Sequence, residues 1–66
     1  MVVWINGEAR ELADDARVLD ALGTLGLPQT GVAVAVNGEV VPAGAWPNRM
    51  LGADDAVEIV RPFGGG

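Results

Sequence analysis

The stretch VAVAVNGEVVP, which runs from Val32 to Pro42, carries the clearest structural signal in the chain. Its first five residues form a nearly continuous apolar run, which is typical of a central strand covered on at least one side. Asn37-Gly38 is the dipeptide most typical of a two-residue hairpin turn. A short return strand follows, and Pro42 ends the pairing because it has no backbone N–H to donate. We therefore predict a β-hairpin here.

The same turn dipeptide occurs near the start of the chain. Met1 to Ile5 is rich in β-forming residues, Asn6-Gly7 follows, and Glu8 to Leu12 is the expected return strand. A two-residue turn pairs Ile5 with Glu8 and Met1 with Leu12. Alternation along the strands then places Met1, Val3, Ile5 and Leu12 on one face of the pair, and Val2 and Trp4 on the other.

One long helix is predicted between the hairpins, from Arg17 to Leu25. Its apolar residues fall at i, i+1, i+4 and i+7 and form one stripe, namely Val18, Leu19, Leu22 and Leu25. Gly26 and Pro28 end it. After the second hairpin, a loop with one helical turn is expected around Trp46, which is predicted to pack beneath that loop. Ala56 to Val60 alternates between apolar and polar residues, as a final strand does.

This order of elements limits the possible architectures. A single helix can cover only one face of a sheet, so we predict an α+β fold in which the helix packs on a mixed sheet of four to five strands. The first and last strands are expected to be central and parallel, which is the ubiquitin-like β-grasp arrangement. The expected core is formed by Val3, Ile5, Leu19, Leu22, Val34, Val36, Val57 and Ile59. One domain would span residues 1–61, followed by a flexible tail, residues 62–66.

Two pairs of acidic residues precede regular elements: Asp14-Asp15 before the helix and Asp54-Asp55 before the last strand. Acidic clusters can bind metal ions, but these pairs lie at positions where carboxylates cap turns and helix starts. We therefore interpret both pairs as capping residues and expect no metal site.

Composition excludes several classes of function. The 66 residues contain nine acidic residues, four arginines and neither histidine nor cysteine, with a net charge of −5. An acidic surface of this kind disfavours nucleic acid, whose binding depends on neutralised phosphates. Lysine and tyrosine are missing too, so the usual nucleophiles and near-neutral acid–base groups are absent and self-contained catalysis is not expected. The N-terminal apolar run stops after Ile5, which predicts no signal peptide or membrane span and a cytoplasmic location.

Several motifs resemble the ThiS family, the sulfur carriers of thiamin biosynthesis, which are related to the small subunit of molybdopterin synthase. They are Val3-Trp-Ile-Asn-Gly-Glu8, the Gly31 to Pro42 stretch, Trp46 and the terminal glycines, in the order and spacing of that family. The chain departs from the family pattern at a few positions. Aspartate stands at positions 15 and 54 where the family has glycine, and Arg17 replaces a threonine, which removes the expected capping box.

The resemblance implies a defined chemistry. An ATP-dependent adenylyltransferase, similar to ubiquitin-activating enzymes, would adenylate the carboxylate of Gly66. Sulfur from a cysteine desulfurase relay would then replace AMP to give a thiocarboxylate, which a thiazole synthase would accept. The carrier would need no cofactor and would not be an enzyme. The alternatives are a sulfur carrier for molybdopterin, cysteine or natural-product biosynthesis, and a ubiquitin-like covalent modifier.

The last three residues agree with this interpretation. Gly64, Gly65 and Gly66 have no Cβ, so they could thread a narrow channel in a partner's active site that a side chain would block. The five residues of the tail span at most about 17 Å when extended. The alternative is a frayed chain end without a role.

Further candidate partner contacts lie on the domain. Trp4, Ala33, Ala35 and Val40 are expected to share the sheet face opposite the helix, where small alanines would let a partner approach closely. A tolerated apolar surface is the alternative. Arg61, Pro62 and Phe63 are candidates next to the tail. Arg61 could instead be an ordinary exposed strand end, and Phe63 could fold back onto the domain.

Overall fold

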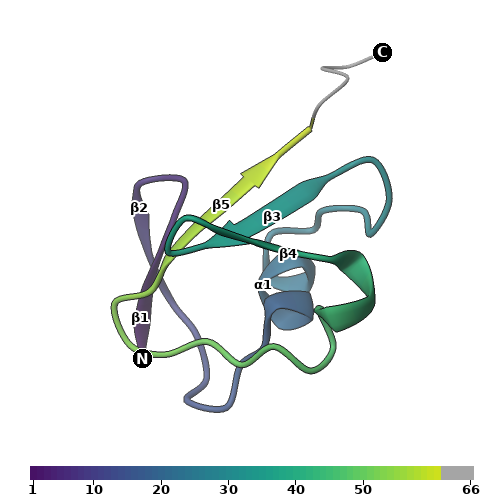
Figure 1. Cartoon of the computed structure of the whole chain (residues 1–66). Helices are drawn as coiled ribbons and strands as arrows, with labels where there is room; N and C mark the ends of the chain where they lie inside the picture. Colours follow the sequence, from purple (N-terminus) through teal and green to yellow (C-terminus); the bar gives the residue numbers. More distant parts are fainter. Residues whose placement is uncertain (62–66) are drawn as a thin grey trace.

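A computed structural model describes residues 1–61 of the chain. Its elements in order are β1 (Val2–Ile5), β2 (Glu8–Glu11), α1 (Val18–Thr24), β3 (Ala33–Val36), β4 (Glu39–Val41), the 3-10 helix η1 (Ala43–Ala45) and β5 (Ala56–Val60). The strands form one five-stranded sheet in the order β2-β1-β5-β3-β4 (Figure 1). β1 and β5 run parallel, whereas the other neighbouring pairs are antiparallel.

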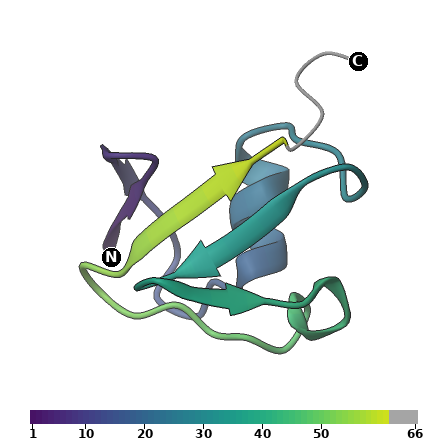
Figure 2. The same ribbon diagram turned by 45° about the horizontal axis from the view of Figure 1, so that its top comes forward.

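The helix α1 lies on one face of this sheet and leaves the other face open (Figure 1 and Figure 2). The parallel pair β1 and β5 lies inside the sheet, with β2 and β4 at its edges. The predicted mixed sheet with a single main helix, and the predicted position of the first and last strands, are therefore confirmed.

The first hairpin has the predicted register. Ile5 pairs with Glu8, and the backbone N–H of Leu12 donates to the carbonyl oxygen of Met1 at 2.8 Å. Val3 and Ile5 are buried against the core, and Trp4 points to the open face. All four residues of β2 are exposed, because this short strand forms the sheet edge and its charged side chains reach water.

The core lies between α1 and the sheet, and it contains every predicted core residue except Leu19. Val18 and Leu22 of the helix are buried, as are six side chains from three strands, namely Val3, Ile5, Val34, Val36, Val57 and Ile59. Leu19, however, only packs against the edge of the core. Val18, Ala21 and Leu22 follow the i, i+3, i+4 spacing and face the sheet, which turns Leu19 to the flank.

The start of α1 corrects the expectation that its capping box is lost. Arg17 occupies the N-cap position, and its side chain makes no cap hydrogen bond because a guanidinium group has no acceptor. The other half of the box is present, since the Asp20 carboxylate accepts the backbone N–H of Arg17 at 2.8 Å. The helix thus keeps an acidic group in its first turn, where the helix dipole favours it.

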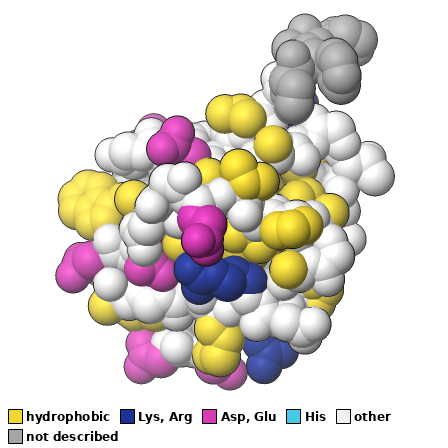
Figure 3. Space-filling view, viewed as in Figure 1, with side chains coloured by type: hydrophobic (Ala, Val, Ile, Leu, Met, Phe, Trp, Pro, Cys, Tyr) yellow, Lys and Arg dark blue, Asp and Glu magenta, His cyan; other side chains and the backbone are white. Residues whose placement is uncertain are grey.

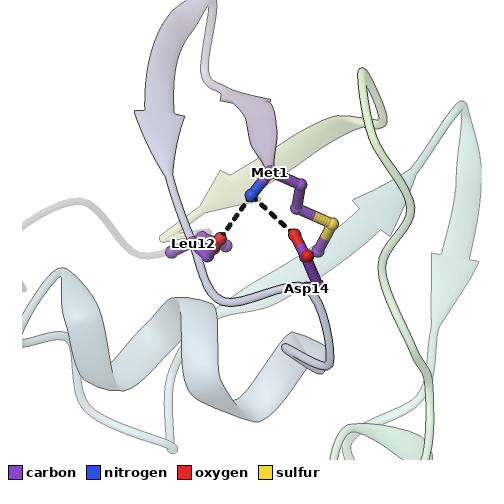
Figure 4. A network of polar contacts seen from close by, with 3 residues as sticks. All are labelled: Met1, Leu12 and Asp14. Carbon is purple, nitrogen blue, oxygen red and sulfur yellow. Dashed lines mark hydrogen bonds and ion pairs between the residues drawn. The ribbon is translucent and has the colours of Figure 1, made fainter.

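The interpretation of Asp14 as a helix cap is wrong. Its carboxylate lies 3.0 Å from the Met1 ammonium group, which also donates to the carbonyl oxygen of Leu12 at 2.7 Å (Figure 4). The Asp14 carboxylate raises the pKa of the Met1 ammonium, because it both accepts a hydrogen bond from it and carries the opposite charge. Asp14 therefore ties the start of β1 to the segment that leads into α1.

The second acidic pair does hold a turn. Asp55 accepts the backbone N–H of Gly52 at 2.7 Å, and this hydrogen bond lowers the pKa of the Asp55 carboxyl. Its neighbour Asp54 has a φ of 66° and so adopts the left-handed conformation of the glycine it replaces. Asp15 is not among the non-glycine residues of positive φ in the described chain. Of the two positions where aspartate stands in place of the family's glycine, only position 54 has a left-handed backbone.

Trp46 is buried next to η1 as predicted. Its indole Nε1–H donates to the carbonyl oxygen of Val41 at 2.9 Å, which fixes the loop after β4 against the core. No helix among residues 1–61 is long and apolar enough to cross a membrane. The same residues contain no group of three or more His, Cys, Asp or Glu side chains that could hold a metal ion.

Candidate functional site

The strand that precedes the C-terminal residues, β5, is the central strand of the sheet. β5 pairs with β1 on one edge and with β3 on the other, and it ends at Val60. Arg61 is exposed and is the last described residue. The predictions for Pro62, Phe63 and Gly64 to Gly66 fall outside the described residues and stay predictions.

The asparagines of both hairpin turns contact β5. The Asn6 side-chain amide accepts the N–H of Ile59 at 2.8 Å and donates to the carbonyl oxygen of the same residue at 3.0 Å. Asn37 accepts the N–H of Ala56 at 2.9 Å and donates to the Asp55 carboxylate at 3.0 Å. Both edges of the central strand are therefore held by side chains in addition to the sheet ladder.

Both asparagines have a φ of 51°, a left-handed backbone that asparagine tolerates better than most residues. Gly7 and Gly38, which follow them, have φ values of 83° and 84°. Positive φ at two successive residues defines the type I′ turn, which matches the twist of the flanking strands and is favoured by Asn-Gly. The turn dipeptides that predict the hairpins thus also supply the contacts to β5, a second role that the sequence analysis missed.

The open face of the sheet carries the predicted candidate contacts. In the strand register, Ala35 lies between Val40 and Glu58, and Ala33 lies opposite Val60. Residues paired in this way point to the same face. Trp4 and Val40 are exposed, at 43% and 73% of their surface, and hydrophobic side chains gather over β3, β4 and β5 on this face (Figure 3).

The structure brings only some of these residues together. A shallow depression on the open face is lined by Ala33, Val34, Ala35, Val40, Glu58 and Val60. Trp4 does not line it, because β5 lies between β1 and β3 and Trp4 pairs with Ala56 near the start of β5. The sequence analysis did not name Glu58 and Val60. Alternation with the buried residues Val57 and Ile59 was the signal that could have identified them.

The depression on this face is almost wholly apolar. Glu58 is the single ionisable residue among those that line the depression, and its neighbours there are apolar. A carboxylate surrounded by aliphatic side chains can pair with a basic group of a partner.

Comparison with known proteins identifies the family. The model described as "ThiS family" matches residues 3–66, which is nearly the whole chain and includes the terminal glycines. The chain belongs to the ThiS family. The sulfur carrier protein ThiS of Thermus thermophilus is 37% identical over 65 residues, which cover 98% of this chain and all of that protein.

A second relative is much longer than this chain. A thiazole synthase of Paramagnetospirillum magneticum is 38% identical over 66 residues, which are 100% of this chain and 20% of that protein. The ThiS-like stretch thus spans one fifth of the length of that synthase.

Solved ThiS structures have the same fold. The crystal structure of the thiamine biosynthesis protein ThiS from Geobacter metallireducens superposes with a TM-score of 0.84 at 32% identity and full coverage of both chains. Its solution structure gives a TM-score of 0.80, with 100% of this chain and 88% of that chain covered. The ubiquitin-like β-grasp fold and the resemblance to ThiS proteins are thereby confirmed.

Proposed function

We propose that the terminal carboxylate of Gly66 is the group on which this ThiS protein carries sulfur. Membership of the family makes the chain a sulfur carrier of thiamine biosynthesis. The observation that carries the proposal is that the family match continues to Gly66, through three glycines that have no side chains of their own. The chain has no cysteine, so it has no thiol that could carry sulfur as a persulfide.

A carboxylate needs activation before sulfur can replace one of its oxygens. Transfer of AMP from ATP to the Gly66 carboxylate releases pyrophosphate and gives an acyl adenylate, a mixed anhydride with a good leaving group. A sulfide anion, or the terminal sulfur of a persulfide, then attacks the acyl carbon and AMP departs. With sulfide the product is the thiocarboxylate directly, whereas with a persulfide a thiol must afterwards cleave the S–S bond.

Other proteins supply the catalysis in this scheme. An ATP-dependent adenylyltransferase activates the carboxylate, a cysteine desulfurase relay supplies the sulfur, and a thiazole synthase accepts it. The relative from Paramagnetospirillum magneticum supports the last of these, because a thiazole synthase that contains a ThiS-like stretch has donor and acceptor in one chain. This chain itself catalyses no step.

The fold supports the proposal because the strand that leads toward Gly66 is the central strand of the sheet. The chain continues from the end of β5 toward Gly66. A partner can therefore bind the sheet while the Gly66 carboxylate enters its active site. The open face with Ala33, Ala35 and Val40 offers a surface on which such a partner can dock. Trp4 and Arg61 are further proposed contacts at its margins.

Intact mass spectrometry tests the proposal. The full chain is incubated with a ThiS-activating adenylyltransferase, ATP and sulfide, and its mass is expected to rise by about 16 Da as one oxygen is exchanged for sulfur. Omission of ATP is the control and is expected to abolish the gain. Fragmentation is expected to place the added mass on Gly66. An unchanged mass in the complete reaction, or sulfur on another residue, would show the proposal to be wrong.

A further inference from the structure

The Asn6 side chain makes two hydrogen bonds to the backbone of Ile59, as a neighbouring strand would. Its Oδ1 accepts the N–H of Ile59 at 2.8 Å and its Nδ2 donates to the carbonyl oxygen at 3.0 Å. The polarity of the peptide fixes the orientation of the amide, because each atom of the amide meets the complementary backbone group. β1 itself ends at Ile5, so this side chain extends the pairing of β5 beyond the point where the main chain turns away.

The contact matters because of its place on β5. The opposite edge of the strand is paired with β3 up to Val60, which lies opposite Ala33. With Asn6 on the other edge, the strand is held from both sides almost to its last residue. The segment that leads to Gly66 therefore starts from a point whose position and direction are fixed relative to the sheet.

Asn37 provides a natural comparison at the other end of the same strand. It has the same φ of 51°, it precedes a glycine in the same turn type, and its amide also accepts a β5 N–H, that of Ala56. The two asparagines differ in which end of β5 they hold. Asn37 contacts the start of the strand, beside the turn between β3 and β4, and Asn6 contacts the end that continues toward Gly66.

We propose that Asn6 is a positioning residue for sulfur loading, which acts by fixing the end of β5 from which the C-terminal segment departs. This inference rests on the proposed function of Gly66. When the folded part is docked on an activating enzyme, any freedom at Ile59 spreads the carboxylate over more positions and lowers its effective concentration at the reacting centre. The open face is unchanged by this freedom, so the loss is expected in kcat rather than in KM.

Asn6→Gly and Asn37→Gly form a matched pair of variants. Glycine adopts the positive φ of both positions without strain, and Gly-Gly is compatible with the same turn. Each variant removes one side-chain amide from one end of β5. Amide hydrogen exchange is expected to accelerate at Ile59 only in Asn6→Gly, and at Ala56 only in Asn37→Gly.

The decisive measurement is the rate of ATP-dependent pyrophosphate release by a ThiS-activating adenylyltransferase. The concentration of each full-length carrier is varied, at a temperature below the melting temperature of every variant. Asn6→Gly is expected to lower kcat at least about fivefold with KM within about twofold of the wild type. Asn37→Gly is expected to leave both constants near the wild-type values. If Asn6→Gly does not fold, Asn6→Asp is tested instead. Aspartate tolerates positive φ and keeps the acceptor for the Ile59 N–H, but it has no N–H to donate to the Ile59 carbonyl oxygen.

The outcomes separate the two proposals. A wild-type carrier that releases no pyrophosphate and gains no sulfur overturns the function proposed for Gly66. An active wild type with equal effects of Asn6→Gly and Asn37→Gly overturns the role of Asn6 alone, as does a rise in KM at constant kcat. Unchanged exchange at Ile59 in a folded Asn6 variant also overturns it. A selective fall in kcat, with faster exchange at Ile59, supports it.

Discussion

The ammonium group of Met1 lies 3.0 Å from the carboxylate of Asp14 and is held there beside the carbonyl oxygen of Leu12 (Figure 4). Because of this pairing, the stability of the protein is expected to depend on the protonation of the Met1 amino group. Because the chain contains no histidine, cysteine, lysine or tyrosine, its α-amino group is the one group that ordinarily titrates between about pH 6 and 9.

We predict that the free energy of unfolding is constant between about pH 6 and 8 and falls above pH 8. The Asp14 carboxylate raises the pKa of Met1 above its ordinary value of 8.0 in the folded state. A raised pKa means that the stabilisation is complete below the unfolded value and is lost as the pH rises through the folded value. Urea unfolding between pH 6 and 10 measures this, on protein whose intact mass shows that Met1 is retained.

Asp14→Asn is the control for this prediction. It keeps the shape of the side chain and removes the charge, so it is expected to reduce the decline at alkaline pH. The same decline in both proteins would show that the Met1–Asp14 contact does not cause it.

Leu22 and Leu19 provide a second comparison, because both belong to α1 but differ in burial. Leu22 has 0% exposure, whereas Leu19 only packs against the edge of the core. Leu22→Ala is expected to lower the free energy of unfolding by about 2–5 kcal/mol, as large-to-small changes in a core do. Leu19→Ala, which deletes the same atoms, is expected to cost less than about 2 kcal/mol. Equal losses in urea unfolding would place both residues in the core.

The difference between these two leucines shows that a sequence pattern does not predict the burial of every residue in a helix. An apolar stripe at i, i+1, i+4 and i+7 predicts that a helix forms, but it leaves the centre of the buried face undecided within one residue. Alanine is only weakly apolar, so Ala21 adds little to the pattern although it is fully buried. The hairpins were predictable in full register, because each Asn-Gly turn fixes which residues pair.

Contacts between distant residues were not predictable. Asn6 reaches Ile59 across 53 positions of the sequence, and Asp14 reaches Met1 across 13. No pattern of neighbouring residues in the sequence predicts either contact. Alternation did predict which side chains of the candidate site share the open face, but strand order decides which of them adjoin. The insertion of β5 between β1 and β3 separates Trp4 from Ala35, and only the three-dimensional arrangement shows this.

Asp54 and Asp55 are neighbours for which the same substitution is expected to have opposite effects. Asp54 has a φ of 66°, so Asp54→Gly relieves backbone strain and is expected to stabilise the protein by about 0.5–1 kcal/mol. Asp55→Gly removes the acceptor for the N–H of Gly52 and the partner of Asn37, and is expected to destabilise by about 0.5–1.5 kcal/mol. Thermal and urea unfolding at pH 7 measure both.

The pKa of Asp55 allows a test of whether its carboxylate causes the effect of Asp55→Gly. Its hydrogen bond from Gly52 lowers the pKa below the ordinary value of 3.8, so its stabilisation is present above about pH 4 and lost as the pH falls through the folded value. The difference between wild type and Asp55→Gly is therefore expected to shrink below about pH 4. A difference that persists at pH 2 would assign the effect to the backbone rather than to the carboxylate.

The last prediction concerns Gly65, which precedes the residue proposed to carry sulfur. If the terminal glycines must enter a narrow channel in the activating enzyme, the methyl group of Gly65→Ala is expected to slow thiocarboxylate formation. The free energy of unfolding is expected to stay within about 0.5 kcal/mol of the wild type, as for other changes remote from the core. Deletion of Gly66 is expected to reduce the reaction more strongly, because the reactive carbon moves back by about 3.4 Å.

Gly44→Ala is the matched control for this experiment. Gly44 lies in η1 without a positive φ, and a Cβ added there would meet no atom within 4 Å. The control adds the same methyl group to the same residue type, far from Gly66 in the sequence, and it is expected to load sulfur at the wild-type rate. Intact mass spectrometry after short incubations with adenylyltransferase, ATP and sulfide measures the three variants together. If Gly65→Ala and the Gly66 deletion both load sulfur as fast as Gly44→Ala, the terminal glycines do not enter a restrictive channel and the carboxylate of Gly66 is not the acceptor.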